Sequence, residues 1–179
     1  MHSAQLGASA PADNIIQAPS HATHGKLSLV GQVQCGLNLF LPMKNRAQMP
    51  ALMAILQTVQ PKVTAALREL HYVHFARFVP TMDGSTLMVI TVFDGAPEMV
   101  GDKDSYTDSM KAYLMDFVAV IGDEFTAILE FVDGAPRLPV KKYPRDFVEF
   151  VIANNLPINP FSAYPEMTVI DIIRARGIR

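Results

Sequence analysis

The chain has 179 residues, of which 50% are hydrophobic and 18% are charged, a composition typical of a globular protein with a substantial core. Its fifteen lysines and arginines stand against seventeen aspartates and glutamates, so no overall positive charge favours binding to nucleic acid or to an anionic membrane. No stretch approaches the roughly 18 consecutive apolar residues of a membrane span, and we expect a cytoplasmic protein that does not contact a membrane.

The cysteine content and the first residues bear on compartment and domain organisation. Cys35 is the only cysteine, so the chain has no internal disulfide, in agreement with a reducing compartment. A lone thiol is also a poor metal ligand, and we expect no metal site. Residues 1–26 lack the cationic start and apolar run of a secretory signal. They are predicted to form a flexible tail that precedes a single domain at 27–179.

The first predicted elements are a strand and a long helix. Apolar residues alternate with polar ones near 33–41, which predicts a strand that ends at Pro42. Apolar residues at steps of three and four then predict an amphipathic helix over 49–70. Pro61 falls inside this helix and predicts a kink or short break, because proline lacks the N–H group and clashes with the preceding turn.

A hairpin and a second long helical stretch follow. Two runs rich in β-branched and aromatic residues, 71–79 and 86–94, flank an Asp83-Gly84 turn and predict a β-hairpin. A helical pattern covers 106–132 and is interrupted by Gly122, which predicts two consecutive helices that meet there.

The C-terminal part is predicted to contain a short helix, a strand and a last helix. Pro144 suits the first position of a helix that ends at residues 154–155. The segment 158–165 is predicted to form one more strand. Thr168 and Asp171 resemble a capping box that opens a helix ending at Gly177.

The resulting order is strand, helix, strand, strand, helix, strand, with helical additions around the last strand. This order predicts an α+β fold of the ferredoxin-like, split βαβ type with extra C-terminal helices.

The predicted sheet has two apolar faces, which suggests a partner. In the run 86–94, one face carries Met88, Ile90 and Val92, and the other carries Leu87, Val89 and Phe93. Helices cover one face, and apolar surface left in water costs about 25 cal/mol per Å². A second copy of the sheet is the simplest cover, so we expect a homodimer that closes into a dimeric α+β barrel.

Three short motifs support the same fold by resemblance. They are His74 to Arg77, Phe93-Asp94-Gly95, and Tyr113-Leu114 with Asp116-Phe117. With their flanking segments, over roughly 34–176, they resemble an uncharacterised bacterial group of dimeric α+β barrel proteins. That group is distantly related in fold to the dye-decolourising peroxidases and chlorite dismutases. The resemblance implies the barrel fold and raises haem as a cofactor, although the chain lacks the GxxDG loop of haem-binding dye-decolourising peroxidases.

The central motif offers a histidine and an arginine as candidate ligand-binding residues. His74 and Arg77 lie on opposite faces of an ideal strand, so they share a ligand only if the strand contains a bulge. His74 is interpreted as a satisfied core residue, an acid–base group or a haem ligand. Arg77 is expected to pair with Asp94, Asp116 or Asp123, or to anchor a ligand carboxylate.

The other candidates come from the end of the hairpin and the helix after it. Asp94 is interpreted as a turn residue or as a catalytic carboxylate. Tyr106 and Tyr113 lie two helical turns apart and are interpreted as core residues or as part of a substrate pocket.

Taken together, these patterns predict a small-molecule-binding dimeric barrel with an apolar pocket between the sheet and its helices. It would be either a cofactor-independent enzyme or an accessory protein, with His74, Arg77, Asp94 and Tyr113 as the polar residues of its pocket. One alternative is a haem-dependent, peroxidase-like protein with His74 as axial ligand. The other is a structural dimerisation module without catalysis. The sequence carries no nucleotide-binding or common hydrolase motif.

Overall fold

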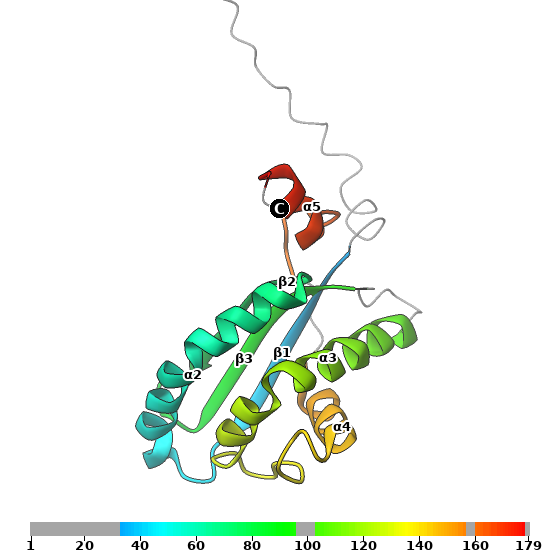
Figure 1. The fold of residues 1–179 in the computed structure, drawn as a ribbon. Helices are drawn as coiled ribbons and strands as arrows, with labels where there is room; N and C mark the ends of the chain where they lie inside the picture. The colour runs from blue at the N-terminus through cyan, green and yellow to red at the C-terminus, as the bar shows by residue number, and fades with distance from the viewer. Residues whose placement is uncertain (1–32, 96–102, 157–159, 178–179) are drawn as a thin grey trace, which may run out of the picture.

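A computed structural model describes residues 33–95, 103–156 and 160–177, without the side chains of 103–106. These residues form an α+β fold in which a three-stranded antiparallel sheet packs with four α-helices, and the chain begins in the order strand, helix, strand, strand (Figure 1). The predicted N-terminal tail lies outside the described residues. Within them, every helix is too short or too polar to span a bilayer.

The sheet has the strand order β1-β3-β2. Its strands are β1 (Gln34–Pro42), β2 (Val73–Pro80) and β3 (Thr86–Asp94). Both outer strands run antiparallel to β3, so β1 and β2 are parallel to each other with β3 between them. The two hairpin strands and the first strand therefore lie where their alternating patterns predict them.

The helices lie mainly on one face of the sheet. They are α2 (Met49–Leu70), α3 (Lys103–Leu129), α4 (Pro144–Asn154) and α5 (Val169–Ala175). Figure 1 shows α2 and α3 across the sheet and α5 beyond its end, near the start of β2. The first three helices contribute buried apolar residues to one core, whereas α5 has no buried residue.

Two predictions about helix breaks have different outcomes. The backbone leaves the helical conformation at Ile121, beside Gly122, so the predicted junction of two helices is confirmed. Helix α2 instead continues through Pro61 without the short break that was one of the two predicted outcomes there. Buried Leu56 and Val63 hold the helix against the core on both sides of Pro61, which outweighs the loss of one backbone hydrogen bond.

The predicted last strand is not formed in the part of the chain that the structure describes. Residues 157–159 lie outside it, and 160–165 are irregular and turn-like. The physical reason is the proline content, because Pro157, Pro160 and Pro165 have no N–H group to donate to a neighbouring strand.

A short stretch after α4 lies at the free edge of β1 instead. The backbone N–H of Asn38 donates to Oδ1 of Asn155 at 2.9 Å, and that of Leu156 donates to the Asn38 carbonyl at 3.0 Å. At Asn38 this edge therefore bonds with a short stretch of chain rather than with a full strand.

One face of the sheet forms the core, and the other is partly exposed. The core face carries buried residues such as Leu39 on β1 and Phe93 on β3. We call the opposite face the outer face; it includes Phe40, Phe75 and Ile90. Phe40 is 37% exposed and Phe75 is 45% exposed. The prediction of apolar residues on both faces of the sheet is thus confirmed.

Candidate functional site

The structure brings two of the four predicted site residues together. His74 Nε2 lies 2.7 Å from Oδ1 of Asp94, and the two side chains are 12% and 14% exposed. Arg77 is exposed on the outer face, opposite Ile90. Tyr113 is buried on the other side of the sheet, among the core aromatics. The four residues therefore occupy three separate places.

A β-bulge positions His74. In the register of β2 with β3, Val73 is opposite Phe93 and Phe75 is opposite Val92, so His74 is an extra residue in the ladder. Such an insertion bends the strand and redirects a side chain. Here it allows the imidazole to meet the carboxylate at the end of β3.

The carboxylate of Asp94 joins the sheet to α5. Its Oδ1 is bonded to His74, and its Oδ2 accepts a hydrogen bond of 2.8 Å from the backbone N–H of Val169. An ionised carboxylate can only accept, so Nε2 of His74 carries a proton in this pair. In a neutral ring Nδ1 is then an acceptor, which is the arrangement that a general base or a ligand-binding histidine requires.

Further polar bonds attach the C-terminal segment to β1. The side chain of Gln34 donates to the carbonyls of Tyr164 and Met167 at 3.0 and 3.1 Å. Thr168 and Asp171 form the capping box predicted for the last helix, each side chain accepting a 3.1 Å bond from the other's backbone N–H. Since α5 buries no residue, these bonds and Asp94 hold it in place.

Two clefts meet at His74 and Phe75. The larger, which we call the α2–α5 cleft, has about 620 Å³ and is bounded by the end of α2, the start of β2 and α5. Its walls include apolar Leu67, Val73 and Ile173. The smaller, about 350 Å³, lies on the outer face and includes Gln34 and Tyr164 in its lining.

The lining of the α2–α5 cleft has one sign of charge. Four of its residues are basic and none is acidic: Arg68, His71, His74 and Arg176. Sequence reasoning missed Arg68, His71 and Arg176, because they come from the end of α2 and the end of α5, which are about 100 residues apart in the chain.

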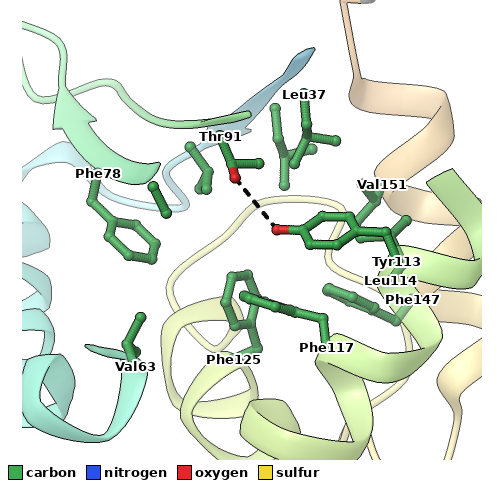
Figure 2. A pocket seen from close by; sticks show the side chains of 13 residues that line it. Leu37, Val63, Phe78, Thr91, Tyr113, Leu114, Phe117, Phe125, Phe147 and Val151 are labelled. Carbon is green, nitrogen blue, oxygen red and sulfur yellow. Dashed lines mark hydrogen bonds between the residues drawn. The ribbon is translucent and has the colours of Figure 1, made fainter. Parts of the chain in front are cut away.

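Tyr113 belongs to the packed interior. Figure 2 shows its ring among Phe117, Phe147 and Leu114, with its hydroxyl directed toward that of Thr91. The two hydroxyl oxygens are 3.5 Å apart. The Tyr113 ring stacks on Phe93 with centroids 4.3 Å apart, and burial raises the pKa of Tyr113 to about 12. The cavity beside it has about 10 Å³, which is about the space that one water molecule needs.

The expected carboxylate partners of Arg77 have other partners. Asp94 is bonded to His74, Asp116 accepts from the Tyr72 hydroxyl at 3.1 Å, and Asp123 pairs with Lys141 at 2.6 Å. In the described parts of the chain, Arg77 forms no ion pair.

Cys35 is a core residue rather than a reactive one. It is fully buried, and burial together with the nearby charge of Asp94 raises the pKa of its thiol to about 12. Over the described residues, no group of three or more potential ligands is arranged to hold a metal ion.

The pairing of His74 with Asp94 limits how His74 could hold a haem iron. Its Nε2 is engaged by Asp94, so an iron bond would need Nδ1 or would break this pair. We therefore derive no chemistry from haem.

The chain has no significant match among protein-family models, curated proteins or solved structures.

Proposed function

We propose that this protein binds a small, largely apolar molecule in the α2–α5 cleft, with the His74–Asp94 pair as its polar element. The observation that carries the proposal is the position of His74, which is held by a carboxylate and lies at the junction of two clefts. The cleft also has a suitable size, since small-molecule sites in proteins measure about 300–1,000 Å³.

The chemistry of the pair supports a ligand that is recognised at one polar point. Asp94 fixes the orientation and the protonated nitrogen of His74, as carboxylates do for histidines that bind ligands or transfer protons. The apolar walls at Leu67, Val73 and Ile173 would bury the rest of the molecule.

Thermal unfolding of the full chain with a panel of apolar acids, alcohols, amines and quinones tests the proposal. A ligand at 100 times its dissociation constant stabilises the protein by about 2.7 kcal/mol. Phe75→Ala should weaken binding, because Phe75 lines both clefts. Phe40→Ala is the matched control, since it removes another partly exposed aromatic ring from the outer face. A panel without any binder, or equal losses in the two variants, would contradict the site.

We also propose that the fold is a ferredoxin-like split βαβ domain that pairs through the outer face as a dimeric barrel. The order β1-β3-β2, with parallel β1 and β2 connected by α2, supports the first part. The partial exposure of Phe40 and Phe75 supports the second.

Sedimentation or light scattering at micromolar concentration tests the dimer. The expected mass is twice that of one chain, and Ile90→Lys should return it to that of one chain, because it places a charge on the outer face. A wild-type protein with the mass of one chain would refute the dimer without affecting the proposed ligand site.

A further inference from the structure

From the charges of the α2–α5 cleft we infer that its ligand is an anionic amphiphile, with an acidic head group held by Arg68 and Arg176 over an apolar body. This inference rests on the proposed function, because it assigns a chemical class to the ligand of that cleft. It excludes neutral and cationic apolar molecules as the preferred ligands.

The local charge of the cleft differs from that of the chain. The chain has a formal net charge of −2, whereas this cleft has basic residues and no acidic one in its lining. A concave site with one sign of charge concentrates ligands of the opposite sign. The carboxylate of Asp94, which contacts the lining residue His74, also accepts a hydrogen bond from the backbone N–H of Val169.

Arg68 and Arg176, like Arg77, form no ion pair within the described residues, whereas several other basic side chains do. Lys62 pairs with Glu124, Arg137 with Asp146, and Lys141 with Asp123. By contrast, among the side chains of 33–95, 107–156 and 160–177 no carboxylate lies within ion-pair distance of Arg68 or Arg176. Guanidinium groups remain charged and bind carboxylates and phosphates through paired N–H donors, so the cleft presents two uncommitted anion-binding groups.

The backbone conformation of His71 supports a role in ligand binding for this end of α2. His71 ends α2 in the left-handed conformation, with φ of 54° and ψ of 18°. Glycine adopts this conformation without steric cost and is the usual residue after the end of a helix. A histidine at this point gives up some stability and places an imidazole in the lining of the cleft.

Three matched probes test the inference on the full chain: 4-phenylbutanoate, 4-phenylbutan-1-ol and 4-phenylbutylamine. They share one apolar body and differ only in the charge of the head group. Calorimetry or NMR titration should give the carboxylate an affinity about tenfold above that of the alcohol, and the amine the weakest affinity. Arg68→Gln and Arg176→Gln should each weaken the carboxylate about threefold, on the order of what exposed charge pairs contribute, and should leave the alcohol unchanged.

Arg174→Gln is the matched control, because Arg174 lies in the last turn of α5, two residues before Arg176, and does not line the cleft. Equal binding of alcohol and carboxylate, lost in Phe75→Ala, would refute the anionic ligand while the ligand site itself stands. Equal effects of Arg174→Gln and Arg176→Gln would also refute the anionic ligand site. The overall positive charge of this region, rather than contact with Arg176, would then explain the preference for the carboxylate. If inorganic phosphate binds as tightly as 4-phenylbutanoate, the apolar body contributes nothing, and the inference that the ligand is an amphiphile is refuted. No binding of any probe, with no binder in the wider panel, would remove the proposed function as well.

Discussion

The interior between the sheet and α2, α3 and α4 differs in kind from the end of the sheet where α5 lies. The interior is held by apolar contacts, including stacked and edge-to-face aromatic rings of Phe93, Tyr113, Phe117 and Phe125. The end of the sheet is held by hydrogen bonds to Asp94 and Gln34, and its helix has no buried residue. Stability therefore resides in the interior, and the polar, open end is the region that can bind and release a molecule.

The largest expected effect comes from a change in the interior. Phe147 is 1% exposed, and Phe147→Ala should lower the free energy of unfolding by about 3–5 kcal/mol, because it leaves a cavity. Phe161→Ala is its control at the end of the sheet, where the ring is fully exposed, and should change stability by less than about 0.5 kcal/mol. Denaturant unfolding measures both values, and similar losses would mean that the two regions do not differ as described.

A smaller and more local effect is expected at Asp94. Asp94→Ala removes the bonds to His74 and to the N–H of Val169, and hydrogen bonds to charged groups contribute about 1.5–3 kcal/mol. Hydrogen exchange should become faster in 160–176 and remain slow in β1 and β3. Uniformly faster exchange across the sheet would show that Asp94 supports the whole fold rather than the attachment of α5.

The smallest expected effect is a pH dependence of α5. The hydroxyl and backbone N–H of Thr168 lower the pKa of Asp171 below its usual value. A lowered folded-state pKa means that the contribution of Asp171 is complete above its unfolded pKa, near 3.9, and is lost as the pH falls through the folded value.

The Asp171 effect can be followed by the local exchange of α5 between pH 5 and pH 2. Asp171→Asn should remove this dependence, while Arg174→Gln should retain most of it, because the hydrogen bonds of Thr168 are its larger cause. If the pH dependence of exchange in α5 persists in Asp171→Asn, another titrating group causes it.

Most of the fold was predictable because its information is local. Alternation and steps of three and four place β3 at 86–94 and α4 at 144–154, as the structure has them. The capping box of α5 was also predictable, since both of its residues lie within one turn. The strand predicted at 158–165 does not form in the part of this segment that the structure describes. It was predicted because the apolar residues of this segment were given more weight than its prolines.

The candidate site was predictable only in part, because its contacts are distant in sequence. His74 and Asp94 are 20 residues apart, and Asp94 and Val169 are 75 apart. No local pattern indicates the bulge that makes the first contact. The polarity of Arg77 and Tyr113 suggested site residues, yet the register of β2 places Arg77 on the outer face, and Tyr113 lies on the buried side of α3, in the core.

The bulge in β2 has one more consequence. Since two residues of β2 stand opposite one of β3, the ladder contains one residue more than its pairing requires. A chain without His74 would have a regular ladder at this point, and the apolar residues on either side would keep their faces. The histidine is therefore an addition to a complete ladder, and its deletion would separate what the sheet needs in order to form from what the proposed ligand site needs in order to bind.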